Sequence, residues 1–112
     1  IRKTLLESDM LVLVTPLYYY GMSAQLKIFI DRFCSRNLSI SSRNLKSALI
    51  CAAWNSDDWT FEALSAHYRT LVRYLNFNDQ GMILGAGCGT LQMTKESIFM
   101  QKAYKLGLLL KD

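Results

Sequence analysis

The sequence predicts an α/β fold in which helices cover both faces of a parallel β-sheet. Three short apolar runs, at 10–14, 48–53 and 81–86, have the length and composition of buried strands. Each run is followed by a segment whose apolar residues recur with helical spacing. Strict alternation of strand and helix is typical of parallel sheets with right-handed crossovers. We therefore expect a three-layer α/β/α domain.

Length and composition narrow the class of protein. The chain has 112 residues, 51% of them hydrophobic and 20% charged, as in a single small globular domain. Its apolar runs fall short of the roughly 20 residues that a membrane helix needs, and no signal peptide is visible. Cys34, Cys51 and Cys88 are widely spaced, without the spacing of a metal site, and are predicted to be reduced, buried thiols. We expect a cytoplasmic protein with no membrane partner.

The first strand is expected at Met10–Val14, after residues 1–8, which have the pattern of the last two turns of a helix. Every residue of this strand is apolar, which predicts that both of its faces are covered. Thr15-Pro16 ends the run, because proline has no N–H for the ladder. Three tyrosines and a glycine then form an aromatic loop at 18–21. In open α/β sheets, ligands bind just outside the carboxyl ends of the strands.

The next segment predicts a helix that begins near Ala24, with Ser23 as its N-cap. Lys27 and Asp31 are spaced to pair at i,i+4 on one side of this helix. Its inward side is formed by Leu26, Phe29, Ile30 and Phe33. The polar, serine-rich segment at 37–44 is predicted to be an exposed loop.

The second strand, at 48–53, leads into another aromatic and polar loop, Trp54–Trp59. Asp57 or Asp58 is the expected N-cap of the helix that follows. That helix has the clearest amphipathic pattern of the chain, with inward residues three or four positions apart. These residues are Phe61, Leu64, Tyr68, Leu71 and Leu75.

The third strand, at 81–86, ends in three alternating glycines, Gly85, Gly87 and Gly89. Their spacing differs from the G-x-G-x-x-G of dinucleotide loops, so we interpret them as close backbone packing at a strand end. Thr94 is expected to cap a last helix. The inward residues of this helix are Phe99, Ala103, Leu106 and Leu110.

Residues 9–32 resemble the signature T-P-x-Y-x-G-x…L-K-x-F-I-D-R of the flavodoxin-like NAD(P)H-dependent FMN reductases. The residues that match are Pro16, Tyr18, Gly21, Leu26, Lys27 and Phe29-Ile30-Asp31-Arg32. Within that family the segment is most similar to the multimeric-flavodoxin and iron–sulfur flavoprotein branch. The flavodoxin-like sheet has the strand order 2-1-3-4-5, and the three strands here correspond to 3-4-5. The resemblance implies that residues 1–112 are the C-terminal part of a single flavodoxin-like domain, without its N-terminal strands and phosphate loop.

The resemblance also implies an FMN whose isoalloxazine ring lies against the loop after the first strand. Backbone N–H groups of that loop would face the pyrimidine side of the ring, and the loop after the second strand would border it. The candidate cofactor-binding residues are therefore Thr15, Pro16, Leu17, Tyr18, Tyr19, Tyr20, Gly21 and Met22, with Trp54, Asn55 and Ser56. We expect neither a catalytic side chain nor a metal ligand, because the flavin carries the chemistry.

Three functions stay open on the sequence alone. The first is an FMN-dependent NAD(P)H oxidoreductase of the flavin- or quinone-reductase type, which passes electrons to a small-molecule or protein acceptor when full length. The second is a flavodoxin-type electron carrier, whose usual acidic surface is at odds with the net charge of +4. The third is a fragment or interaction module that binds no flavin.

Two expectations concern macromolecular partners. Arg36, Arg43 and Lys46 are predicted to form a solvated face rather than a nucleic-acid site, because the basic residues are dispersed along the chain. Without a neighbouring first strand, Met10–Val14 would be an open apolar edge, and such an edge is a template for pairing with another chain. We therefore expect a homo-oligomer.

Overall fold

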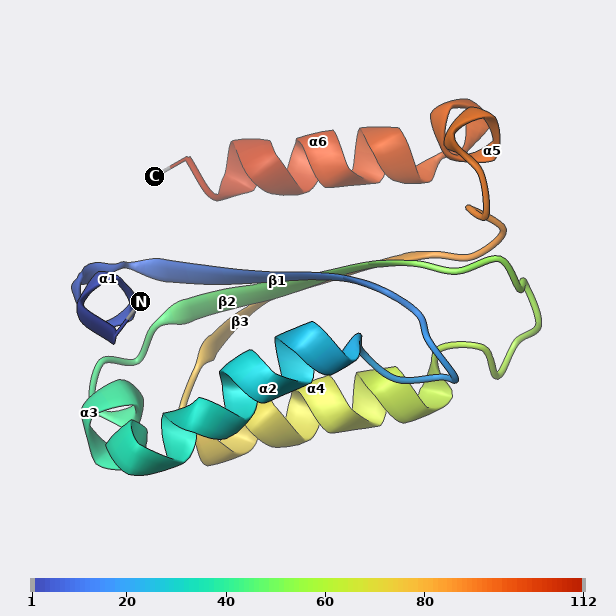
Figure 1. Ribbon diagram of the computed structural model, residues 1–112. Helices are drawn as coiled ribbons and strands as arrows, with labels where there is room; N and C mark the ends of the chain where they lie inside the picture. The colour runs from blue at the N-terminus through green and yellow to red at the C-terminus, as the bar shows by residue number, and fades with distance from the viewer. Residues whose placement is uncertain (1, 112) are drawn as a thin grey trace.

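A computed structural model describes residues 2–111 of the chain. Its centre is a parallel sheet of β1 (Met10–Pro16), β2 (Lys46–Ala52) and β3 (Asn78–Gly85), in the order β1-β2-β3. The helices α2 (Ala24–Asp31) and α4 (Glu62–Tyr74) lie on one face of this sheet, and α6 (Phe99–Leu109) lies on the other (Figure 1). The predicted α/β fold with a parallel three-stranded sheet is confirmed.

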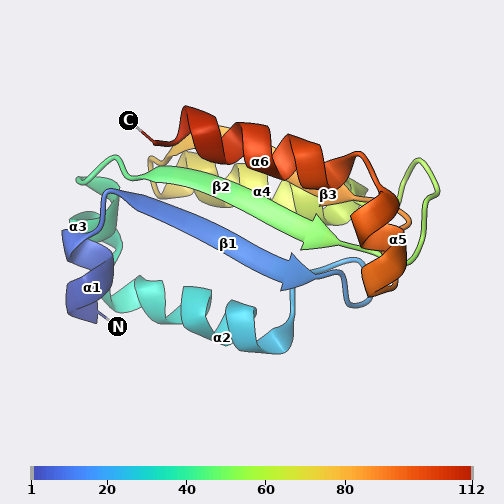
Figure 2. The same ribbon diagram turned by 90° about the horizontal axis from the view of Figure 1, so that it is seen from above.

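Shorter helices lie at the two ends of the strands. The helix α1 (Arg2–Glu7) precedes β1, as expected for residues 1–8, although residue 1 lies outside the described residues, as does residue 112. A 3-10 helix, η1 (Arg32–Arg36), continues α2 and leads into α3 (Asn37–Ser41). The last short helix, α5 (Leu91–Glu96), lies near the carboxyl ends of the strands (Figure 2). Among the described helices, none is long and apolar enough to cross a membrane.

The start of α2 follows the sequence prediction closely. The backbone N–H of Leu26 donates to the Ser23 hydroxyl oxygen at 3.3 Å, which is the contact of an N-cap. One turn later, Lys27 Nζ lies 2.6 Å from Asp31 Oδ1, as the i,i+4 spacing predicts. The cap fixes where the aromatic loop after β1 ends and the helix begins.

A buried polar cluster joins α4 to the sheet. Tyr68 is fully buried, and its hydroxyl lies 2.8 Å from Ser47 Oγ on β2 and donates to Asp79 Oδ1 on β3 at 3.0 Å. Burial raises the pKa of Tyr68 above its ordinary value. These two contacts hold α4 against both neighbouring strands.

The face of the sheet that carries α6 is only partly covered. α6 packs over β3, and β1 is left uncovered (Figure 2). Val12 and Val14 are 42% and 65% exposed, whereas Leu13 and Thr15 are buried on the α2 side. The expectation that β1 is covered on both faces is therefore wrong, because the helix on this side lies two strands away.

The segment at 37–44, predicted to be an exposed loop, is helical over its first half as α3. Ile40 is 1% exposed and belongs to the main core, between Leu38 and Ser42, which are exposed. Burial of this isoleucine outweighs the weak helix propensity of the serines around it.

Two predicted helix caps are wrong. Neither Asp57 nor Asp58 caps α4, because a turn with a 3.0 Å bond from Thr60 N–H to the carbonyl of Asp57 precedes the helix. At the end of the chain, Thr90 rather than Thr94 accepts the capping bond, from Met93 N–H at 3.2 Å. This cap starts α5, and α6 is a separate helix.

Candidate functional site

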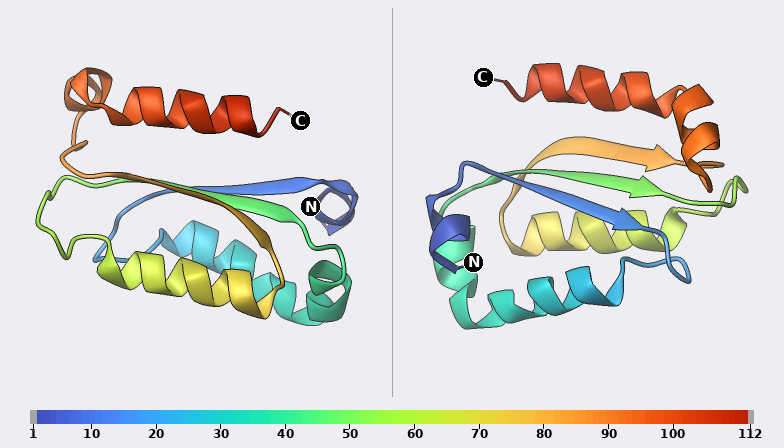
Figure 3. Two further views of the ribbon diagram at one scale, coloured as in Figure 1. Left: turned by 180° about the vertical axis from the view of Figure 1, so that it is seen from behind. Right: turned by 45° about the horizontal axis from the view of Figure 1, so that its top comes forward.

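Three loops follow the three strands at the same end of the sheet, where the strand arrowheads lie together (Figure 3). Backbone bonds join these loops to one another. Leu17 N–H donates to the Ala52 carbonyl at 2.9 Å, and Cys88 N–H donates to the Ala53 carbonyl at 2.7 Å. Gly87 N–H donates to the Asn55 carbonyl at 3.1 Å. The carboxyl edge of the sheet is therefore one continuous surface built from all three loops.

The tyrosine loop contains a tight turn. Tyr18 N–H donates to the Gly21 carbonyl at 3.0 Å, and Gly21 N–H donates to the Tyr18 carbonyl at 3.1 Å. The central residues Tyr19 and Tyr20 have φ values of 45° and 67°, which is the left-handed geometry of a type I′ turn. Asn-Gly usually occupies these positions, because other residues are strained there by about 1–2 kcal/mol each. Such strain concentrates at functional sites.

The three tyrosines have different surroundings. The ring of Tyr20 packs against Trp59 in the second loop, with centroids 5.1 Å apart and planes inclined by 42°. Tyr18 and Tyr19 are 62% and 100% exposed. The three tyrosines therefore do not all point inward. Tyr20 fixes the turn to the second loop, and the other two rings face solvent.

Trp54 lies against the backbone of the third loop. Its indole occupies the space next to Gly89, where any added side chain would overlap the ring. A Cβ at Gly85 would lie 3.2 Å from both the Cys51 carbonyl oxygen and Cys88 Sγ, and Gly87 has φ of 68°. The alternating glycines thus serve close backbone packing, as predicted. Trp54 stays 67% exposed, so the glycine supports its indole from behind and leaves it accessible.

A shallow hollow of about 220 Å³ lies between the first and second loops. Of the predicted cofactor-binding residues, it brings together Leu17, Tyr19, Tyr20, Trp54 and Asn55. Within residues 2–111, the N–H groups of Tyr19 and Tyr20 donate to no protein group, which leaves them for a ligand. The hollow is smaller than the ~300–1,000 Å³ of typical ligand pockets, so it fits one part of a larger ligand.

The other predicted residues surround the hollow without lining it. Thr15 is buried, and its hydroxyl accepts from Ser23 N–H at 2.9 Å and donates to the Pro16 carbonyl at 2.7 Å, which closes the loop from inside. Met22 is buried in the core. Exposed positions outside the hollow are taken by Pro16, Tyr18 and Ser56, and Gly21 closes the turn.

Sequence reasoning missed two residues of this surface. Ala53 lines the hollow, and Trp59 supports Tyr20. Trp59 could have been predicted from the sequence, because it is the second aromatic residue of a short polar loop. Ala53 could not have been predicted, because a small residue at a strand end has no distinguishing sequence pattern.

The hollow itself is uncharged, and the charges nearby are acidic. Asp57, Asp58 and Glu62 lie at the start of α4, next to the second loop. Beneath the surface, Cys51 and Cys88 are buried as predicted, whereas the prediction is wrong for Cys34, which is exposed. Burial raises the pKa of the Cys51 thiol to about 12, which keeps it protonated and unreactive at neutral pH. The part of the chain that the structure describes contains no group of three His, Cys, Asp or Glu side chains that could hold a metal ion. This arrangement suits a planar, neutral ligand group.

Comparisons with known proteins agree with this architecture. The family model described as "flavodoxin-like fold" matches residues 2–107. The chain is similar to the solved structure of the Trp repressor binding protein from Bacillus subtilis, with a TM-score of 0.80 and 20% sequence identity. That match covers 93% of this chain and 67% of the other, and at this identity it shows a shared fold. No curated protein matches the chain. Since the family model spans nearly all of the sequence, the chain belongs to the flavodoxin-like fold family.

Proposed function

We propose that the hollow between the tyrosine turn and Trp54 binds the isoalloxazine ring of FMN, and that the chain is part of an NAD(P)H-dependent oxidoreductase of the flavin- or quinone-reductase type. The single observation that carries this proposal is the convergence of Tyr19, Tyr20 and Trp54 on one uncharged hollow at the carboxyl edge of a parallel sheet. Bound there, FMN would take up a hydride from NAD(P)H and pass electrons to an acceptor.

The residues present fit a flavin ring. Aromatic side chains on two loops can stack on a broad planar ring, in offset or tilted contact. The N–H groups of Tyr19 and Tyr20 can donate to carbonyl oxygens at the edge of that ring, and the Asn55 side chain adds a donor and an acceptor. The strained turn and the packing of Trp54 on Gly89 hold these groups in place before a ligand arrives.

The same surface does not suit the phosphate of FMN. A phosphate dianion is stabilised by helix N-termini and clustered N–H donors. The N-terminus of α4 is adjacent, but the carboxylates of Asp57, Asp58 and Glu62 would repel the dianion. We propose that residues outside the 112-residue chain supply the phosphate site, as in a complete domain of the reductase family resembled by residues 9–32. The chain on its own would then bind FMN weakly.

An FMN fluorescence titration tests the placement of the ring. Trp54→Ala should weaken FMN binding by about tenfold, since stacking of a base-like ring on an aromatic side chain is worth about 1–3 kcal/mol. Tyr74→Ala is the matched control, because Tyr74 is also 67% exposed but lies at the far end of α4. Equal affinity of the two variants would rule out the hollow as the flavin site.

A second assay distinguishes a reductase from an electron carrier. With FMN in excess, a reductase accelerates NAD(P)H oxidation at 340 nm in proportion to protein concentration, and a carrier does not. The basic net charge of +4 favours the reductase, because carriers of the flavodoxin type use an acidic surface to meet their partners.

A further inference from the structure

The hollow at the carboxyl edge is lined by aromatic rings and by no charged side chain. Tyr19 and Trp54 line it and are 100% and 67% exposed, so both rings are accessible to a ligand. The face of an aromatic ring carries partial negative charge, and it attracts a cation as well as the edge of another ring. These rings therefore favour a neutral ring or an aromatic cation over an aromatic anion.

Three carboxylates lie next to this hollow in the second loop and at the start of α4. Asp57 and Asp58 come shortly after Asn55, which lines the hollow, and Glu62 is the first residue of α4. All three acidic side chains are exposed. The two ion pairs within residues 2–111 lie in α1 and α2, so no salt bridge of the described chain neutralises these carboxylates. Together they give this side of the hollow a negative potential.

The segments that follow the three strands contain no basic residue to balance this potential. No lysine, arginine or histidine occurs at 15–23, 53–62 or 85–94, although the chain has 13 lysines and arginines. The first cation after the third segment is Lys95 in α5, and Glu96 follows it. The acidic second loop follows β2, which has a strand of this chain on each side. The charge bias therefore belongs to the middle of the sheet.

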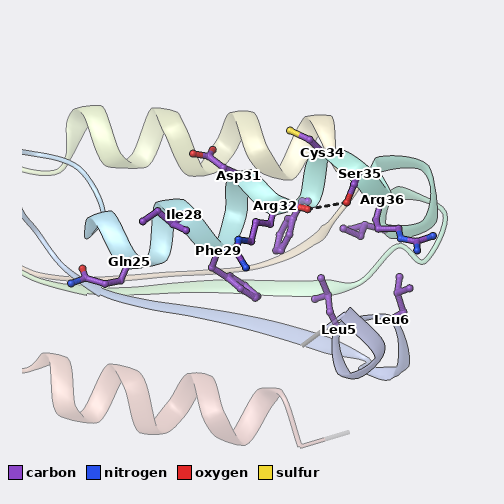
Figure 4. A pocket seen from close by; sticks show the side chains of 12 residues that line it. Leu5, Leu6, Gln25, Ile28, Phe29, Asp31, Arg32, Cys34, Ser35 and Arg36 are labelled. Carbon is purple, nitrogen blue, oxygen red and sulfur yellow. Dashed lines mark hydrogen bonds between the residues drawn. The ribbon is translucent and has the colours of Figure 1, made fainter.

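The larger groove between α1 and α2 has no such bias. Its volume is about 790 Å³, and Asp31, Arg32 and Arg36 line it together with apolar side chains (Figure 4). Charges of both signs within one groove give little preference between a cation and an anion. The groove offers a second place where a planar molecule can bind, but charge selection is expected at the hollow alone.

We propose that the hollow binds planar aromatic cations in preference to planar aromatic anions of the same size, and that Asp57 and Asp58 set this preference. The inference extends the proposed function, because the same hollow is assigned to the neutral ring of the flavin, with which an aromatic cation would compete. A cation keeps the stacking on Tyr19 and Trp54 and gains attraction to the carboxylates. An anion of the same shape keeps the stacking and meets repulsion, which is how a site discriminates between ligands of one shape.

Three planar tricyclic dyes of similar size test the preference by fluorescence titration of the 112-residue chain at pH 7.5. Thionine is a cation, lumiflavin is neutral, and resorufin is an anion at this pH. Thionine should bind about fivefold more tightly than resorufin, and lumiflavin should lie between them. In about 0.5 M salt the difference between thionine and resorufin should fall below about twofold, because salt screens exposed charges.

Paired variants assign the preference to residues. Asp57→Asn combined with Asp58→Asn should weaken thionine binding about threefold to tenfold and change lumiflavin binding by less than about twofold. Glu7→Gln combined with Asp9→Asn is the matched control, because it removes the same charge at the amino ends of the strands, and the preference should stay. Trp54→Ala should weaken the binding of all three dyes by about tenfold.

Two kinds of result would overturn this inference. The first is equal affinity for thionine and resorufin, or a preference that persists after both aspartates are replaced. If lumiflavin still binds in that case, the proposed flavin site stands. The second is thionine binding that Trp54→Ala leaves unchanged, because the dye would then lie in the groove between α1 and α2 or on surface charges. If lumiflavin does not bind and thionine binds as described, the flavin site fails and the charge preference stands.

Discussion

The indole ring of Trp54 occupies the space that a side chain at Gly89 would need. Trp54 follows β2 and Gly89 follows β3, so one wall of the hollow depends on a glycine in a different loop. Tyr20, which also lines the hollow, rests on Trp59 of the second loop. The candidate site is thus shaped by contacts between loops, and four changes probe those contacts and the core beneath them.

The first prediction concerns Gly89→Ala. The added methyl group displaces the indole of Trp54, and overpacking of this kind costs about 1–3 kcal/mol of folding free energy. A red shift of tryptophan fluorescence and a weaker FMN affinity should accompany the loss. Gly107→Ala is the control, because nothing lies within 4 Å of its added Cβ and it lies inside α6. It should stabilise the chain by about 0.5–1 kcal/mol. A Gly89→Ala variant with unaltered fluorescence would contradict the packing described.

The second prediction concerns Tyr19→Asn. Asparagine adopts left-handed backbone more easily than tyrosine, so the free energy of unfolding should rise by about 0.5–1 kcal/mol in urea titrations. The same change removes an aromatic wall of the hollow and should weaken FMN binding. Higher stability together with lower affinity is the expected signature of strain kept for function. A fall in both the free energy of unfolding and the FMN affinity would show that the backbone of Tyr19 is not strained in this turn.

The third prediction concerns Tyr68→Phe. Loss of the hydroxyl leaves Ser47, which is fully buried, without its partner and removes the bond to Asp79. We expect a loss of about 1–3 kcal/mol in the free energy of unfolding, measured by chemical denaturation. Unchanged stability would show that the cluster does not hold α4 to the sheet.

The fourth prediction concerns alkaline pH. Burial raises the pKa of Cys51 from 9.0 to about 12, so the folded state keeps a proton that the unfolded state loses. The stabilisation from this group is complete below pH 9 and is lost as pH rises from 9 to 12, with a slope of up to about 1.4 kcal/mol per pH unit. Cys51→Ala should therefore show a shallower fall in stability between pH 9 and 10, and an equal slope in both proteins would refute this assignment.

The fold was predictable where local pattern and tertiary packing agree. Three apolar runs became parallel strands in sequence order, and Ser23 caps α2. The predictions failed where a tertiary contact decides the outcome. Ile40 is drawn into the core and makes a helix of a serine-rich segment, and the choice between Thr90 and Thr94 as a cap depends on where the chain leaves β3.

The candidate site was predictable at the level of loops but not of side chains. The resemblance indicated both loops, after β1 and after β2, yet Thr15 is buried at the end of β1 and Met22 is buried in the core. The alternation of side chains along β1 explains Thr15, which shares the inward side with Leu13. The left-handed turn at Tyr19 and Tyr20 was not foreseeable, because tyrosine is unusual at both positions.

The most direct test of the account compares FMN with riboflavin, which has the same ring and no phosphate, by calorimetry on the 112-residue chain. Because the proposed site would contact the ring alone and acidic residues lie beside it, we predict weak binding of both ligands, with affinities within about threefold of each other. Trp54→Ala should weaken the binding of both ligands by about tenfold. Sub-micromolar FMN binding, with a strong preference over riboflavin, would contradict the account, as would the absence of saturable riboflavin binding.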